Sequence, residues 1–243
     1  MHIKMLNITA VMMGETNTIH PTLVWDDENA ILIDTGYPGQ LPLIRTAMEE
    51  AGVPFEKLTQ VIITHQDLDH VGSLPSILQE AAQKIEVLAN PIEIPYIDGS
   101  KRPLKLTDEA VAQAEASLPP DVPAEWKQAF LSLLKNPPQA PVDTTIAHGD
   151  TLPCGLTVID TPGHTPGHIS LYHAPSKTLI AGDAMVIEAG QLNGPSPLYT
   201  LDMETATRSL QQFTSFDIET VICYHGGSAS DNVNQRLSEL AGV

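Results

Sequence analysis

Residues 64–70 concentrate the side chains of this sequence that are best suited to bind metal. His65, Asp67, Asp69 and His70 lie within this one short segment. Neutral imidazole and carboxylate groups are ligands for Zn, Fe or Mn. His65 and Asp67 alternate and can point the same way, whereas Asp69 and His70 are adjacent and must point differently. The spacing indicates a site that holds two ions.

Four other motifs share one arrangement, in which an apolar, strand-like run ends at a polar or glycine-rich turn. They are Asp34-Thr35-Gly36, Thr161-Pro162-Gly163-His164, Ala181-Gly182-Asp183 and His225-Gly226-Gly227. A rigid strand fixes the loop residue that follows it, and α/β scaffolds place functional groups at such positions. We therefore treat these motifs and residues 64–70 as parts of one candidate site.

Taken in order, the five motifs resemble those of the metallo-β-lactamase superfamily. The H-x-H-x-D-H motif of that family appears as residues 65–70, with Asp67 in place of the second histidine. The T-P-G turn carries the single histidine of the family, which is His164 here, and the A-G-D motif carries its bridging aspartate, Asp183. The H-G-G motif carries its last histidine, His225, and the D-T-G motif carries its early aspartate, Asp34. The matches span about residues 17–230, which is most of the chain.

This resemblance implies a centre with two divalent ions. Seven side chains would hold them: His65, Asp67 and His164 at the first ion, Asp69, His70 and His225 at the second, and Asp183 between the two. We expect Asp69 and Asp183 to take part in catalysis as well as in metal binding. Asp34 is expected to orient a ligand or the loop of the main motif.

The resemblance also implies a hydrolase, in which a metal-bound hydroxide attacks an ester-type carbonyl. We favour a lactonase or carboxylic ester hydrolase, with a glyoxalase II-like thioesterase or a non-catalytic metal-binding sensor as alternatives. Zn is our first choice of metal. The carboxylate of Asp67 gives the first site two histidines and one carboxylate, a set that also suits Fe or Mn.

Three residues outside this ligand set bear on the site. His168 begins a predicted strand, and we favour a structural role for it. His20 precedes Pro21 near the expected rim, so both a structural role and a substrate contact are open. Tyr199 lies between the last two metal motifs, where lactonases of the family carry a tyrosine near the leaving group.

The elements that must position these residues form two similar halves, each of strands followed by helices. Strands are predicted at 3–13, 17–25, 30–34, 60–64, 85–89, 157–159, 169–173, 178–180 and 220–223, the first two paired around Gly14-Glu15. Helices are predicted at 42–52, after His70, after Asp202 and at 232–240. The resemblance implies an α/β (α+β) fold: a four-layer αβ/βα sandwich of two mixed β-sheets with helices on the outer faces and metals at one edge.

A Pro-rich helical insertion at about 94–140 is expected within an otherwise single domain over 1–243. Thr107 and Pro123 are predicted to start its two helices. The second helix carries an apolar stripe: Trp126, Ala129, Phe130, Leu133 and Leu134. We expect this stripe to pack against the core. A lid or pocket wall beside the metals is the alternative.

Composition limits the partners of this protein. The net charge is −18 and the sequence pI is about 4.6. This balance argues against nucleic acid and anionic membrane surfaces, because both require a basic face. No apolar stretch approaches the roughly 20 residues that span a bilayer, and the first residues lack a signal-peptide pattern. We expect a cytoplasmic protein that acts on a small-molecule substrate, with a homodimer left open.

Overall fold

Two six-stranded mixed sheets lie face to face in the computed structural model, which describes residues 1–12 and 15–243. The first sheet has the order β1 (His2–Met5), β4 (Thr22–Trp25), β5 (Ala30–Ile33), β6 (Gln60–Ile63), β7 (Glu86–Ala89) and β8 (Thr144–Thr145). The second has the order β16 (Gly227–Ala229), β15 (Thr220–Cys223), β12 (Thr178–Gly182), β11 (Ile169–His173), β10 (Leu156–Asp160) and β9 (Thr151–Leu152). Strands β5 to β8 are parallel in the first sheet, and β12 and β15 are parallel in the second.

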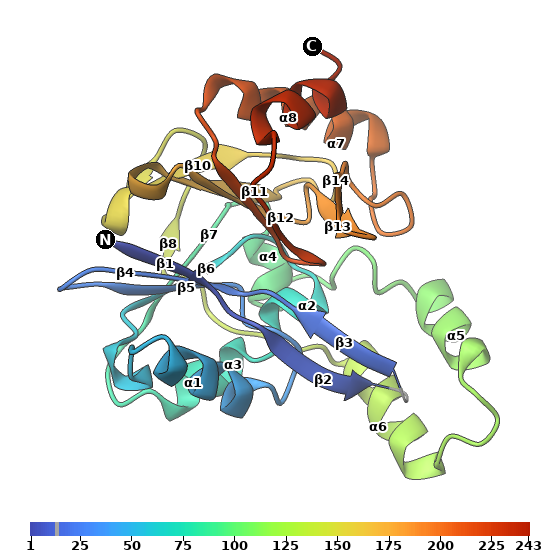
Figure 1. Cartoon of the computed structure of the whole chain (residues 1–243). Helices are drawn as coiled ribbons and strands as arrows, with labels where there is room; N and C mark the ends of the chain where they lie inside the picture. The colour runs from blue at the N-terminus through green and yellow to red at the C-terminus, as the bar shows by residue number, and fades with distance from the viewer. Residues whose placement is uncertain (13–14) are drawn as a thin grey trace.

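Helices cover the outer faces of both sheets (Figure 1). The first sheet is covered by α1 (Leu41–Glu50) and α3 (Leu74–Glu80), and the second by α7 (Met203–Ser209) and α8 (Val233–Ala241). Short elements complete the chain: hairpins β2–β3 (Ile8–Met12, Glu15–Ile19) and β13–β14 (Val186–Glu188, Gln191–Asn193), helices α2 (Leu68–Val71) and α4 (Ile94–Ile97), and 3-10 turns at Phe55–Lys57, Pro153–Gly155, Ala174–Ser176 and Leu210–Ser215. The predicted αβ/βα sandwich is confirmed.

Both faces of the first sheet are buried, and successive residues of its strands face opposite sides. In β5, Ile31 and Ile33 point between the sheets, while Leu32 points toward α1 and α3. The layer between the sheets also contains Leu171 and Ile180 from the second sheet. Strands buried on both sides read as continuous apolar runs, which is how they appear in the sequence.

The predicted strands and helices are found near their expected positions, apart from the first two strands. The segments 3–13 and 17–25 each break in two, so that β1 pairs with β4 in the main sheet and β2 pairs with β3 in a separate hairpin. The breaks fall at Leu6-Asn7 and His20-Pro21. The predicted turn at Gly14 lies outside the described residues.

The insertion forms α5 (Asp108–Ser117) and α6 (Ala124–Lys135), which start after Thr107 and Pro123 as predicted. Packing of the α6 stripe against the core was a wrong prediction. Trp126 is 39% exposed and stacks on Phe130, and Leu134 is the one buried residue within α6. The reason is visible in Figure 1, where α5 and α6 stand beside the sandwich and cover neither sheet.

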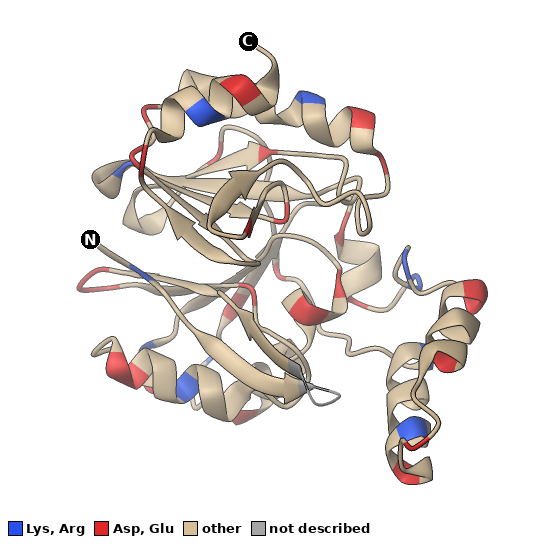
Figure 2. Ribbon diagram, turned by 45° about the vertical axis from the view of Figure 1, so that its right-hand side comes forward, with Lys and Arg blue, Asp and Glu red and all other residues tan. Residues whose placement is uncertain are grey.

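Acidic residues, coloured red in Figure 2, are spread over both helix layers and the α5–α6 pair. The chain carries 30 Asp and Glu residues against 12 Lys and Arg. Within residues 1–12 and 15–243, no helix combines the length and the apolar character needed to cross a bilayer.

Candidate metal centre

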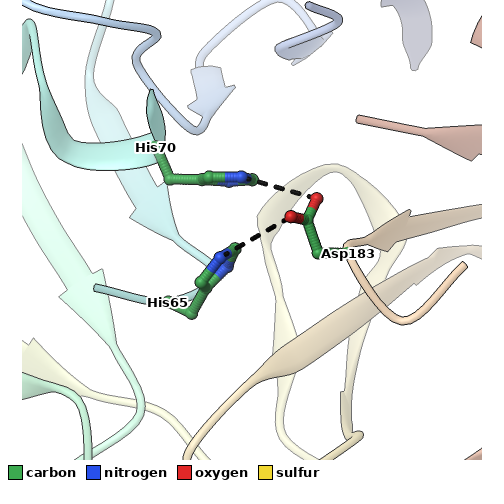
Figure 3. A group of neighbouring side chains, drawn as sticks. All are labelled: His65, His70 and Asp183. Carbon is green, nitrogen blue, oxygen red and sulfur yellow. Dashed lines mark ion pairs between the residues drawn. The ribbon is translucent and has the colours of Figure 1, made fainter. Parts of the chain in front are cut away.

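All seven predicted ligands meet where strands of both sheets end. His65 and His70 follow β6, Asp183 follows β12, and His225 follows β15. Figure 3 shows the imidazoles of His65 and His70 pointing at the two carboxylate oxygens of Asp183. His70 Nε2 lies 3.5 Å from Asp183 Oδ1, and His65 Nε2 lies 3.9 Å from Asp183 Oδ2.

The first three-ligand set joins residues from the main motif and the T-P-G turn. Asp67 Oδ2 lies 3.3 Å from His65 Nε2 and 3.1 Å from His164 Nε2. Asp183 Oδ2 closes the group at 3.4 Å from His164 Nε2. The turn that presents His164 requires Gly163, because its φ is 132° and a Cβ would overlap the backbone of Ala206.

The second three-ligand set lies on the other side of Asp183. Asp69 Oδ2 is 3.1 Å from His225 Nε2 and 3.8 Å from His70 Nε2. Asp183 Oδ2 is 3.6 Å from His225 Nε2, while its Oδ1 faces His70. Asp183 therefore faces both sets of ligands, as a bridging carboxylate must.

The donor atoms fit divalent ions. Tetrahedral ligands about 2.1 Å from a metal are about 3.4 Å from one another, which is close to the separations within both sets. Three of the atoms, His65 Nε2, His70 Nε2 and Asp183 Oδ1, are buried without a hydrogen-bond partner among the described residues. Unpaired buried polar atoms are costly, and a bound cation would satisfy all three.

Asp34 orients the imidazoles of both sets, as the sequence suggested. Its Oδ2 accepts from His70 Nδ1 at 2.9 Å and from the hydroxyl of Thr64 at 2.8 Å. That hydroxyl lies 3.0 Å from His65 Nδ1 and can accept its proton. Each imidazole is therefore held with Nδ1 protonated, which leaves the lone pair of Nε2 for a metal.

Neighbouring histidines favour the ionised forms of Asp67 and Asp183. Burial disfavours the charged form of Asp183, yet His70 and His225 hold its pKa well below the ordinary value. Burial likewise opposes ionisation of Asp67, but its pKa is held well below the usual range by His65 and His164. Asp67 and Asp183 are thus in the form that binds metal.

His168 has the structural role that was favoured for it. Its Nε2 accepts the backbone N–H of Asp183 at 3.0 Å, and its Nδ1 lies 2.8 Å from the hydroxyl of Thr161. Burial lowers the pKa of His168 to about 3. The ring therefore stays neutral and holds in place the turn that carries Asp183.

Glu93 is a functional residue that the sequence analysis missed. It is fully buried, and its carboxylate accepts from Gln66 N at 3.0 Å, Gln66 Nε2 at 2.8 Å and Gly167 N at 2.7 Å. It ties the loop of the main motif to the T-P-G turn. Glu93 follows β7, so the rule that polar residues gather after strands could have found it.

Tyr224, beside His225, was also missed. Its ring lies against the ring of His70, with centroids 3.8 Å apart. Its hydroxyl donates to the carbonyl of Asp69 and accepts from Gly36 N at 3.1 Å. Burial and the charge of Asp69 raise the pKa of Tyr224 well above its ordinary value, so the hydroxyl remains a donor.

A cavity of about 340 Å³ opens over the candidate metal centre. Its lining residues come from the hairpins β2–β3 and β13–β14, from the turns that follow strands of both sheets and from the segment after β14: Asn17, Tyr37, Asp67, Asp69, His164, Asp183, Val186, Ile187, Glu188, Ser196, Tyr199 and His225. None of these belongs to residues 94–140, so the insertion forms no wall of this cavity. His20 is absent from the lining too, because it is buried with Nδ1 3.2 Å from the carbonyl of Leu6.

Comparison with known proteins agrees with this geometry. Residues 17–225 match the family described as the metallo-beta-lactamase superfamily. The probable metallo-hydrolase YflN of Bacillus subtilis (strain 168) is 29% identical over 87% of this chain and 81% of its own length. Hydroxyacylglutathione hydrolase GloC of Haemophilus influenzae is 25% identical over 76% of this chain and 72% of its own.

A solved structure shows the same fold. A metallo-beta-lactamase family protein from Thermus thermophilus superposes with a TM-score of 0.67 and 23% identity, covering 99% of this chain and 78% of that one. The family match covers most of the present sequence and includes all seven candidate ligands, from His65 to His225. The chain belongs to the metallo-β-lactamase superfamily.

Proposed function

We propose that this metallo-hydrolase binds two divalent ions and cleaves a neutral carboxylic ester or lactone. The observation that carries the proposal is the pair of three-ligand sets that share Asp183, each open to the same cavity. Two divalent ions held by these residues would lower the pKa of a bound water molecule and polarise a substrate carbonyl. Zn is the first choice for both sites, and the carboxylate of Asp67 keeps Fe or Mn open for the first.

The protein's own residues would hold and orient the reacting groups. Asp69 and Asp183 can accept hydrogen bonds from a nucleophilic water, because both carboxylates face the cavity. Asp34 orients His65 and His70 through their Nδ1 atoms, and Glu93 links the loop of the main motif to the T-P-G turn.

Tyr37 is placed to donate a hydrogen bond to the substrate. It lines the cavity, and its backbone is fixed by Gln40 Oε1, at 2.8 Å from its N–H, and by Ser73 Oγ, at 2.6 Å from its carbonyl. Burial and the charges of Asp69 and Asp183 raise the pKa of Tyr37 well above its ordinary value. The phenol therefore stays protonated and can stabilise negative charge on the leaving oxygen.

Tyr199 is the second candidate for this contact. It also lines the cavity but is 62% exposed. An exposed phenol is less preorganised than a partly buried one, so we assign the stronger contribution to Tyr37.

The cavity favours a neutral substrate. None of the described residues that line it is Lys or Arg, whereas four are acidic: Asp67, Asp69, Asp183 and Glu188. Val186 and Ile187 supply an apolar wall for an acyl chain. Three of these acids are candidate metal ligands, so Glu188 is the lining carboxylate left to repel an anionic substrate such as a phosphodiester.

A thioesterase is the second candidate, because the relatives include hydroxyacylglutathione hydrolases. The test is a panel of γ- and δ-lactones, nitrophenyl esters, acylglutathione thioesters and a nitrophenyl phosphodiester, assayed with metal-loaded protein. Lactones and esters should give the highest kcat/KM. Preference for thioesters would replace the first proposal by the second, and no turnover with metal fully bound would favour a non-catalytic sensor.

A further inference from the structure

Lys105 places a cation against the first set of candidate metal ligands. It lies between α4 and α5, and its Nζ is 2.5 Å from Asp67 Oδ2 and 2.7 Å from His164 Nε2. These two atoms and His65 Nε2 are the three that would bind the first ion. Motif spacing gives no indication of this contact, because Lys105 comes from the insertion.

The local backbone holds Lys105 in this position. The N–H of Leu104 donates to Gln66 Oε1 at 2.6 Å, and Gln66 lies between two of the metal ligands. Gln66 is fixed in turn by Glu93. The Lys105 side chain is 21% exposed, so it is mostly covered by its neighbours.

The contact with His164 is incompatible with metal binding. An imidazole Nε2 that is not protonated has a single lone pair, which can accept from an ammonium group or bind an ion but cannot do both. A carboxylate offers several acceptor positions, so Asp67 can keep Lys105 and still serve an ion. Binding of the first ion must therefore break the Lys105–His164 contact and can leave the Lys105–Asp67 pair.

The second ligand set has no such cation. Among the described residues, Asp69 has ion-pair partners only in His70 and His225, and Asp183 only in histidines. The two sites thus differ in one respect that the ligand types alone do not reveal. The first ion competes with a tethered ammonium group, and the second does not.

We propose that Lys105 is a built-in competitor for the first metal site. It holds Asp67 and His164 while that site is empty, it makes the first site the weaker of the two, and it couples the first ion to the segment of residues 98–107. This inference rests on the proposed two-ion centre. Coupling is reciprocal. If Lys105 weakens binding of the first ion, binding of that ion must also weaken the contacts that hold Lys105.

The direct test is a Zn²⁺ titration of the metal-free protein against a chromophoric chelator, in wild type and Lys105→Met. Methionine keeps much of the length and the apolar stem but removes the charge. Losing a hydrogen bond between charged groups corresponds to about a 10- to 100-fold change in affinity. We expect the weaker of the two Kd values to fall by that factor and the stronger to stay constant.

The matched control is Lys101→Met, which removes an exposed lysine from the same segment. It should leave both Kd values unchanged. If Lys105→Met still binds two ions but its first-site Kd is unchanged or higher, the proposed role of Lys105 is wrong while the two-ion centre stands. Failure of wild type and variant alike to bind two ions would instead overturn the two-ion centre.

Lysine labelling of the unmodified protein gives a second test that does not depend on folding of the variant. Acetylation by an amine-reactive ester, followed by mass spectrometry of peptides, reports how accessible each ammonium group is. Labelling of Lys105 should rise when the second equivalent of Zn²⁺ is added, while labelling of Lys101 stays constant. A constant or lower labelling of Lys105 across that equivalent would contradict the competition.

Discussion

Replacing Asp34 by asparagine should weaken the binding of both metal ions without unfolding the protein. In the native structure Asp34 Oδ2 accepts from His70 Nδ1 and from the Thr64 hydroxyl, which in turn can accept from His65 Nδ1. The amide group of the introduced asparagine would donate where the carboxylate accepts. Each bond then reverses, and both imidazoles are driven to carry their proton on Nε2, the atom needed for metal.

The magnitude follows from comparing two substitutions. Asp34→Asn keeps an acceptor for Thr64 N, 2.9 Å away, and asparagine tolerates the φ of 62° found here. We expect a stability loss of about 1–2 kcal/mol. Asp34→Ala leaves three buried donors unpaired at about 1–3 kcal/mol each and adds about 1–2 kcal/mol for the left-handed backbone. Its loss should be about 4 kcal/mol or more.

The assay pairs urea unfolding with a Zn²⁺ titration of metal-free protein. Loss of a group that orients a metal ligand typically costs about 10- to 100-fold in affinity, so both Kd values should rise by that factor in Asp34→Asn. Asp202→Asn, at a helix start where asparagine also caps well, is the control and should change neither. Wild-type Kd values at both sites in a folded Asp34→Asn protein would refute the proposed role of Asp34.

Three further results are expected. Asp183→Ala and His225→Ala should abolish hydrolysis while far-UV circular dichroism persists, and turnover in either variant with metal content intact would refute its role. Tyr37→Phe should lower kcat/KM for an ester by about 10- to 100-fold, with a smaller loss in Tyr199→Phe; the reverse order would move the leaving-group contact to Tyr199. Glu93→Gln turns one acceptor into a donor facing backbone N–H groups, so urea unfolding should show a loss of about 1–3 kcal/mol. Burial raises the pKa of Glu93 above its ordinary value of 4.5, so the native state binds this proton more tightly than the unfolded state. The free energy of unfolding should therefore fall as the pH rises from about 4.5 through the native pKa. Glu93→Gln should lack this fall, and an unchanged pH dependence in the variant would contradict the assignment to Glu93.

Local sequence predicted the strands and the candidate ligands that follow them. The apolar run before His65 marks a strand buried on both faces, and a strand end fixes the side chains that come next. The order of the motifs then supplied the ligand set. Asp34 could be placed behind that set for the same reason.

Contacts made by segments far apart in the chain could not be predicted in this way. Lys105 reaches Asp67 only because the insertion returns to the main motif loop, and no spacing in the sequence encodes that return. The helical stripe with Trp126 shows a related limit. Periodicity identifies an apolar face, but it does not say which surface covers that face, and here neither sheet does.

The number of ions per chain tests the two-ion centre most directly. The measurement is elemental analysis of the full chain, purified without chelator, saturated with Zn²⁺ and freed of unbound metal. The shared carboxylate of Asp183 and the three-ligand set on each side predict about two ions in wild type, and fewer in Asp183→Ala. A value near zero in wild type, or a single ion that Asp183→Ala leaves in place, would contradict the account.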